Sequence, residues 1–123
     1  MGWFKDRFGK KPRKLTHVVT NFVAEQDGPS ERDLKVRIVE LFHHEPAVER
    51  AYLALAEYGD GTGAHVTLAI KCSYGEDQAL VRKLMSIFGE MFSAHEHLDI
   101  IFVRPDQEHQ LRDVCAPFYQ LNG

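Results

Sequence analysis

Residues 48–72 contain the pattern that most restricts the fold, two apolar segments joined by a glycine-rich stretch. The first segment, 48–58, has apolar or small side chains on both of its faces. The second, 64–72, alternates between apolar residues on one face and mostly polar residues on the other. The stretch 59–63 that separates them alternates glycine with small polar residues, which is typical of a hairpin loop. We therefore expect a β-hairpin whose first strand is central in a sheet.

Two further strands and two long helices are predicted around this hairpin. β-branched and aromatic residues predict strands at 16–24 and 98–103. Apolar residues at helical spacing predict helices at 31–44 and 76–94. The stronger helical stripe is expected to bury Leu84, Phe88 and Phe92 against Leu53, Leu55, Leu68 and Ile70 of the hairpin.

The helix ends have their own signals. Ser30 is expected to be the N-cap of the first helix, with Asp33 three residues later reaching back to it. A last helix is expected to begin at Pro105 and to bend or end at Pro117. Its apolar face would contain Leu111, Val114, Cys115 and Phe118.

The order β-α-β-β-α-β plus a C-terminal helix is the split-βαβ, ferredoxin-like pattern of the α+β class. In that pattern a four-stranded antiparallel sheet carries two helices on one face. We expect residues 15–123 to form a single domain of this kind, because 123 residues suffice for one domain of ordinary size. The fold occurs with many unrelated activities, so it does not assign one.

Residues 1–14 differ from the rest of the chain in charge. They contain six basic residues and one acid, a net charge of +5, so the remainder carries −8 because the whole chain carries −3. We interpret this segment as a basic N-terminal arm, and Trp3, Phe4 and Phe8 would share one side of it if it were helical. Three hypotheses remain open. The arm is a loose or self-packed tail, it fills a groove on a partner protein, or it contacts an anionic membrane surface.

The second face of the central strand raises the question of a partner. Tyr52 and Tyr58 lie on it together with small residues, and Ile101 and Val103 have the same parity on the last strand. Such a face has few charges, so we expect either the final helix, a second subunit or another protein to cover it. A homodimer is the commonest such assembly. The candidate partner-binding residues are therefore Trp3, Phe4, Phe8, Tyr52 and Tyr58.

No residue pattern indicates catalytic chemistry or a cofactor. Cys72 and Cys115 both lie on predicted apolar stripes, so we interpret them as core residues rather than nucleophiles. Their number and spacing indicate no disulfide framework, which favours a reducing cytoplasm. His95 and His97 flank Glu96 and could face one cation, but the further ligands that a metal site needs are not evident, and no metal site is expected. Nucleic acid is not an expected partner of a chain with net negative charge.

Three stretches of the sequence resemble the C-terminal domain of the enhanced-serine-sensitivity protein (SseB) family. They are 46–54 (PAVERAYLA), 65–70 (HVTLAI), and 98–103 (LDIIFV) followed by 116–119 (APFY). The resemblance covers roughly residues 30–119. It implies a bacterial, cytoplasmic, non-enzymatic domain, and the family brings no established catalytic residues to carry over.

These observations together indicate a non-enzymatic binding or regulatory module. One alternative is a small enzyme whose site has no recognisable motif. Another is a peripheral-membrane adaptor that uses the basic aromatic arm.

Overall fold

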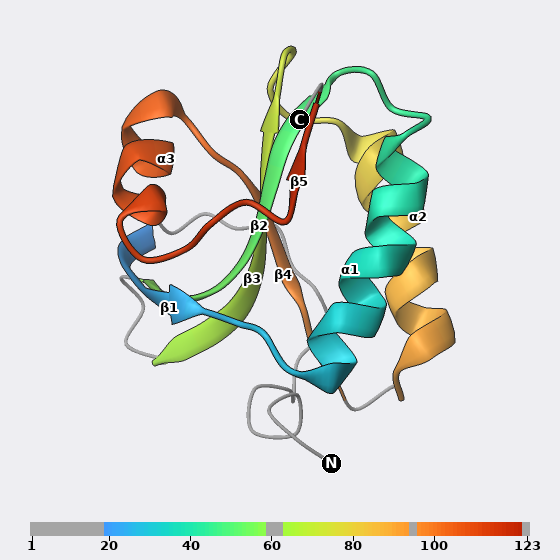
Figure 1. The fold of residues 1–123 in the computed structure, drawn as a ribbon, viewed down its shortest axis with the longest axis horizontal. Coiled ribbons are helices and arrows are strands. Elements are labelled where there is room, and N and C mark those ends of the chain that lie inside the picture. Colours follow the sequence, from blue (N-terminus) through green and yellow to red (C-terminus); the bar gives the residue numbers. More distant parts are fainter. Residues whose placement is uncertain (1–18, 59–62, 94–95, 122–123) are drawn as a thin grey trace.

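The computed structural model describes residues 19–58, 63–93 and 96–121 (Figure 1). The arm expected at 1–14 and residues 16–18 of the first predicted strand lie outside this part of the chain. The described elements follow the order β1 (Val19–Glu25), α1 (Pro29–Phe42), β2 (Val48–Tyr58), β3 (Ala64–Cys72), α2 (Gln78–Met91), β4 (Asp99–Phe102), α3 (Pro105–Arg112) and β5 (Tyr119–Gln120).

All the strands belong to one sheet with β2 at its centre. The strand order is β1-β2-β3-β4, and β5 also pairs with β2. The predicted hairpin is confirmed, since β2 and β3 are antiparallel along almost their whole length, with Leu53 opposite Leu68. β1 and β5 share the other edge of β2, where β1 takes its second half and β5 takes Arg50 and Ala51.

The α+β class is confirmed, and the arrangement is broadly ferredoxin-like, but the sheet differs from the expected one in two respects. It is mixed rather than antiparallel, because β4 runs parallel to β3. The cause is the connection: α2 carries the chain back to the starting end of β3, and strands joined by such a crossover are parallel. The sheet also has a fifth strand, β5, in a segment that had been assigned to the last helix and the residues after it.

α1 and α2 lie side by side on one face of the sheet (Figure 1). The predicted helical stripe is confirmed, with Leu84 and Phe88 buried and Phe92 packed against the same core. The facing residues of the hairpin are buried as expected, except that Leu55 is only partly buried. The core on this face includes Leu34, Ile38, Phe42, Leu53, Leu68, Ile70, Leu80, Leu84, Phe88 and Tyr119.

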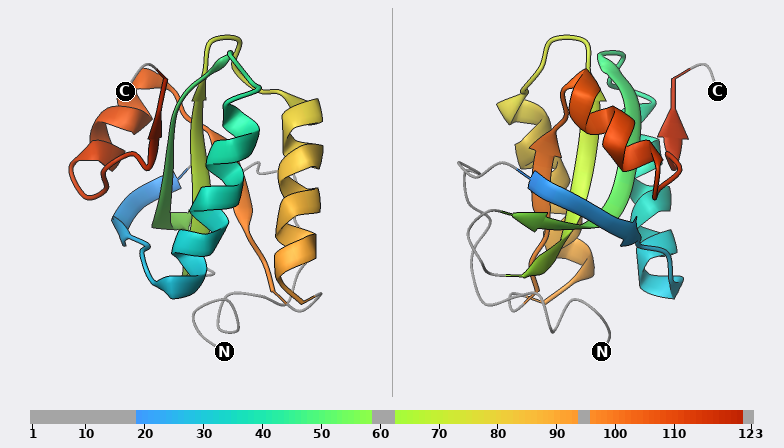
Figure 2. Two further views of the ribbon diagram at one scale, coloured as in Figure 1. Left: turned by 45° about the vertical axis from the view of Figure 1, so that its right-hand side comes forward. Right: turned by 90° about the vertical axis from the view of Figure 1, so that its left-hand side faces the viewer.

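α3 covers the opposite face of the sheet (Figure 2). Its Leu111, together with Cys115 beyond its end, packs on a second buried cluster. That cluster contains Phe22, Tyr52, Ala54, Ala56, Tyr58, Ala69 and Val103. The sequence left open whether the final helix, a second subunit or another protein covers this face. In the structure the final helix covers it.

The helix ends differ from the predicted ones. α1 has Gly28 as its N-cap and Pro29 in its first turn, not Ser30 as N-cap. Proline favours the first helical position because its φ is already helical, and the helix starts earlier for that reason. Glu31 then folds back towards Gly28, where an added Cβ would lie 2.7 Å from its Oε1. α3 ends at Arg112, so Val114 and Phe118 are not on it.

Candidate functional site

A groove of about 730 Å³ lies between the end of α1 and the C-terminal segment. Its lining is mainly aromatic and apolar, with His43 as the one ionisable side chain besides the phenol of Tyr119. The lining residues are Phe42, His43, Pro46, Pro117, Phe118, Tyr119, Gln120 and Leu121. Two of the three stretches that carry the family resemblance, 46–54 and 116–119, therefore contribute to one concave surface.

The end of α1 forms one wall of the groove. A helix leaves its last carbonyl groups without partners inside the helix, so they are available to other donors. Tyr119 Oη donates to the carbonyl oxygen of Phe42 at 3.4 Å. The two rings also meet edge to face, with centroids 5.2 Å apart. This contact attaches the C-terminal segment to α1, and both residues line the groove.

β5 forms the other wall and is held by backbone hydrogen bonds to β2. Phe118 N donates to Ala51 O at 2.9 Å, and Leu121 N donates to Glu49 O at 2.8 Å. Gln120 and Leu121 are exposed beside the groove. Within the part of the chain that the structure describes, β5 pairs with β2 only, so its outer edge faces no strand.

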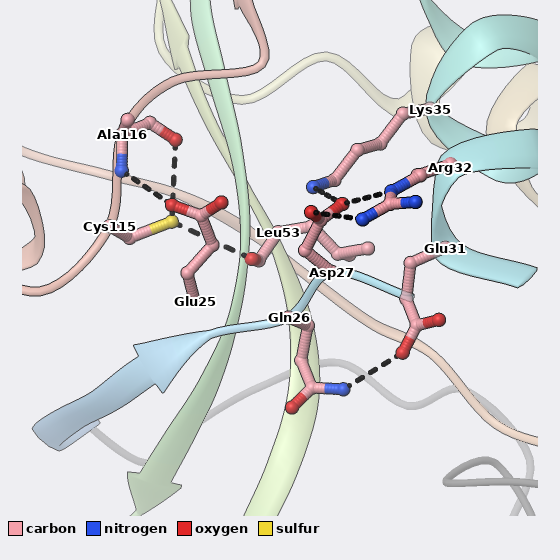
Figure 3. Close-up of polar contacts among 9 residues, drawn as sticks. All are labelled: Glu25, Gln26, Asp27, Glu31, Arg32, Lys35, Leu53, Cys115 and Ala116. Atoms are coloured by element: carbon pink, nitrogen blue, oxygen red, sulfur yellow. Dashed lines mark hydrogen bonds and ion pairs between the residues drawn. The ribbon is translucent and has the colours of Figure 1, made fainter. Parts of the chain in front are cut away.

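Polar contacts position the segment that leads into β5 (Figure 3). Glu25 at the end of β1 accepts a hydrogen bond from Ala116 N at 3.0 Å, and the Cys115 thiol lies 3.6 Å from Leu53 O. On the α1 side, Lys35 binds Asp27 at 3.2 Å. The same ammonium lies 5.8 Å from the ring centroid of Phe118, within cation–π distance. The groove wall is thus attached to both β1 and α1.

A partly buried ion pair holds α3 on the sheet near this wall. Both oxygens of Glu108 accept hydrogen bonds from Arg50, and one also accepts from Tyr52 Oη at 2.5 Å. The Arg50 hydrogen bonds lower the pKa of Glu108 and in turn raise the pKa of Arg50. Burial, together with the bond to Glu108, raises the pKa of Tyr52 to about 12. Around neutral pH, Glu108 and Arg50 therefore stay charged and Tyr52 stays neutral. Constant charge states of this kind suit a structural role.

Carboxylates gather at the end of the sheet next to the groove. Burial, together with the nearby carboxylates of Asp77, Glu49 and Glu45, raises the pKa of the Cys72 thiol to about 11. Glu45 is paired with Lys83 at 2.7 Å, and Glu49 accepts a hydrogen bond from Ser73. Glu49 also lies 3.9 Å from Arg50, which is bound to Glu108, so one cation serves two carboxylates there. The carboxylates beside the groove are therefore only partly neutralised.

The residues proposed from the sequence as partner-binding do not meet at this groove. Trp3, Phe4 and Phe8 lie outside the described residues. Tyr52 and Tyr58 are buried inside the chain beneath α3 rather than exposed to a partner. Tyr58 Oη lies 2.8 Å from Thr67 Oγ1. The sequence placed these two tyrosines on the second face, as found, and the final helix covers them.

The histidine and cysteine predictions can be compared only within the described residues. His97 is buried, with its Nε2 2.6 Å from Asp99 Oδ1, whereas His95 lies outside the described part. No three His, Cys, Asp or Glu side chains among the described residues gather as metal ligands would. Both cysteines are buried free thiols, and burial raises the pKa of Cys115 to about 12.

Sequence reasoning missed the groove because its walls come from segments far apart in the chain. The available signal was the apolar run 116–119 after a predicted helix, with proline at its second position. Proline cannot continue a helix interior, so Phe118 and Tyr119 could have been separated from the helix and considered as a strand.

Comparison with known families supports the resemblance. The model of the family described as SseB protein C-terminal domain matches residues 11–120. No curated protein and no solved structure matches the chain.

Proposed function

The chain belongs to the SseB protein C-terminal domain family, and from this premise we propose that it is a non-enzymatic module that binds a partner protein. The partner would place a segment in the groove between α1 and β5. The setting we propose is the bacterial cytoplasm, where two buried free thiols remain reduced. Among the described residues, no helix is long and apolar enough to cross a bilayer.

The groove is the observation that carries this proposal. It is concave, it is lined largely by aromatic and apolar side chains, and its volume of about 730 Å³ lies in the range of ligand-binding clefts. Aromatic residues dominate the energetics of many protein interfaces. The partly exposed Leu121 and the exposed Pro46 offer apolar surface at its rim.

The chemistry around the groove supports binding rather than catalysis. A thiol acts as a nucleophile in its thiolate form, and raised pKa values of about 11 and about 12 leave Cys72 and Cys115 protonated at neutral pH. The lining contains no carboxylate that could serve His43 as a partner in acid–base chemistry. The residues that the groove presents are those of a binding surface.

The test is a comparative pull-down from the source cells. The bait is the full chain, compared with Leu121→Asp in the groove and Val36→Asp on the exposed side of α1, where Val36 is 62% exposed. The proposal expects proteins that bind the wild type and Val36→Asp but not Leu121→Asp. Identical sets of proteins with all three baits would contradict the groove as the binding site.

A second candidate function rests on the sequence of the arm. With a net charge of +5 and three aromatic residues, residues 1–14 have the composition of a peripheral-membrane anchor. Each basic residue near anionic lipid contributes about 1 kcal/mol. The test is sedimentation with anionic and neutral vesicles, comparing the full chain with a Trp3→Ser, Phe4→Ser, Phe8→Ser variant. Binding to anionic vesicles that the triple variant retains would argue against aromatic anchoring.

A further inference from the structure

The outer edge of β5 is the first element of the inference. An edge strand presents backbone N–H and C=O groups that an additional strand can pair with. β5 uses its inner edge for Ala51 and Glu49 of β2, and its outer edge faces no strand of the described chain. In the right-hand view of Figure 2, β5 stands at the margin of the sheet with no further strand beyond it. The natural occupant of such an edge is a peptide in extended conformation.

The groove lies directly beside this edge. Phe118, Gln120 and Leu121 belong both to the β5 segment and to the groove lining. Successive side chains of an extended peptide point to opposite sides, so every second residue of an added strand would face the groove. β5 spans only two residues, so a few backbone bonds would set the register and apolar side chains in the groove would supply the rest of the affinity.

The charge around the groove indicates which side chains are favoured on the face of the added strand that points away from the groove. Glu45 precedes β2 and Glu49 lies near its start, both beside the groove. Lys83 neutralises Glu45, whereas Glu49 lies 3.9 Å from Arg50 and shares that one cation with Glu108, so a negative charge remains in excess there. The sequence after residue 14 also carries a net charge of −8. Electrostatic attraction acts over a Debye length of about 8–10 Å at physiological salt, which covers the immediate surroundings of the groove. Side chains of an added strand that do not enter the groove would therefore be favoured if they are Lys or Arg.

We propose that the groove and β5 edge together recognise an extended segment of a partner protein in which large apolar residues alternate with Lys or Arg. The segment adds to β5 as a further antiparallel or parallel strand, with its apolar side chains in the groove. This inference rests on the proposed function and adds the conformation and chemistry of the partner segment.

The experiment measures fluorescence anisotropy of labelled peptides of about ten residues, alternating Lys with Phe or Val, on titration with the full chain. A second peptide replaces every Lys by Glu. Two more carry N-methyl groups on every second amide, one at the odd positions and the other at the even positions. Only one edge of an added strand faces β5, so methylation of one parity should weaken binding at least about tenfold and the other parity should be tolerated. The Glu peptide should also bind at least about tenfold more weakly.

The outcomes separate this inference from the proposed function. Equal tolerance of both methylated peptides, with binding still lost in Leu121→Asp, would overturn strand addition and leave the groove as the binding site. Lys and Glu peptides of equal affinity would overturn the basic partner segment. No saturable binding of the Lys peptide up to about 1 mM would overturn the inference as a whole. The pull-down comparison judges the groove itself and does not depend on any of these peptides.

Discussion

At the scale of single residues, one carboxylate joins α3 to the sheet. Glu108 is buried and accepts hydrogen bonds from Arg50 and Tyr52 of β2. Glu108→Ala should lower the free energy of unfolding by about 2–4 kcal/mol, because it leaves a partly buried guanidinium and a buried phenol without their partner. Urea denaturation measures the change. Asp106→Asn in the same helix is the control, because the Asp106–Arg104 pair is exposed and its loss should have much less effect. Equal effects of the two variants would contradict the structural role of Glu108.

The same network predicts how stability depends on pH. Arg50 holds the pKa of Glu108 below its ordinary value of 4.5. The ionised Glu108 therefore adds to the free energy of unfolding above pH 4.5, and this contribution is lost as pH falls through the lowered pKa. Burial raises the pKa of Tyr52 from 10.0 to about 12, so its contribution is present below pH 10 and is lost as pH rises towards 12. We expect the free energy of unfolding to fall at both ends of a pH series. Glu108→Gln should flatten the acid side and Tyr52→Phe the alkaline side; unchanged profiles would refute the assignment.

A core aromatic gives a further prediction at this scale. Phe88 is buried, and the centroid of its ring lies 4.8 Å from the ring centroid of Phe92. Phe88→Ala should cost about 3–5 kcal/mol, the usual loss for a core aromatic. Thermal unfolding provides the measurement, with Tyr74→Ala as the control because Tyr74 is 85% exposed. A melting temperature that both substitutions change equally would mean that Phe88 does not contribute to the core.

Periodicity predicted the core residues at this scale but not the polar network. The spacing of Leu84 and Phe88 depends only on the geometry of one helix, so a single sequence contains it. Arg50 and Glu108 are 58 positions apart, and nothing local indicates that they meet. Their contact depends on where α3 crosses the sheet, which is a property of tertiary packing.

At the scale of elements, α3 acts as the cover of the second face. Leu111 is fully buried in the cluster that contains Tyr52 and Val103. Leu111→Asp should detach α3, because an unpaired charge cannot be buried there without a large penalty. We expect increased binding of a hydrophobic dye and increased light scattering as the face is uncovered. Gln110→Asp, on the exposed side of the same helix, should show neither change, and dye binding by this control would contradict the assignment.

The sequence predicted most helices and strands but missed two features that depend on the neighbouring strand: the direction of β4 and the existence of β5. β2 and β3 were predicted with their bounds, since their patterns are long and regular. The direction of β4 was wrong because a strand pattern indicates pairing but not orientation. β5 was missed because two residues are too few to show alternation, and β2 creates the strand by pairing with it.

At the scale of the whole molecule, the covered second face bears on oligomeric state. The homodimer was predicted because that face needed a cover, and α3 provides one within the chain. Light scattering at micromolar concentration should therefore give a mass near 14.1 kDa. Twice that mass would retain the homodimer and place its interface on another surface. The same measurement tests whether the arm contributes to self-association. The Trp3→Ser, Phe4→Ser, Phe8→Ser variant should have the same mass as the unchanged chain.

The position of β5 also bears on the order in which the chain folds. β1, β2 and β3 are close neighbours in sequence and can associate early, whereas Cys115 and Leu53 meet across 62 residues. Contacts between distant residues form late because a long loop must first close. During synthesis β1 to β4 and most of the core beneath α1 and α2 could assemble before residues 116–121 emerge, and the groove could not, because these residues contain β5 and Tyr119. A polypeptide shortened before Phe118 would then retain most of the sheet but lack one wall of the groove, so the groove would be completed only in the last step of folding.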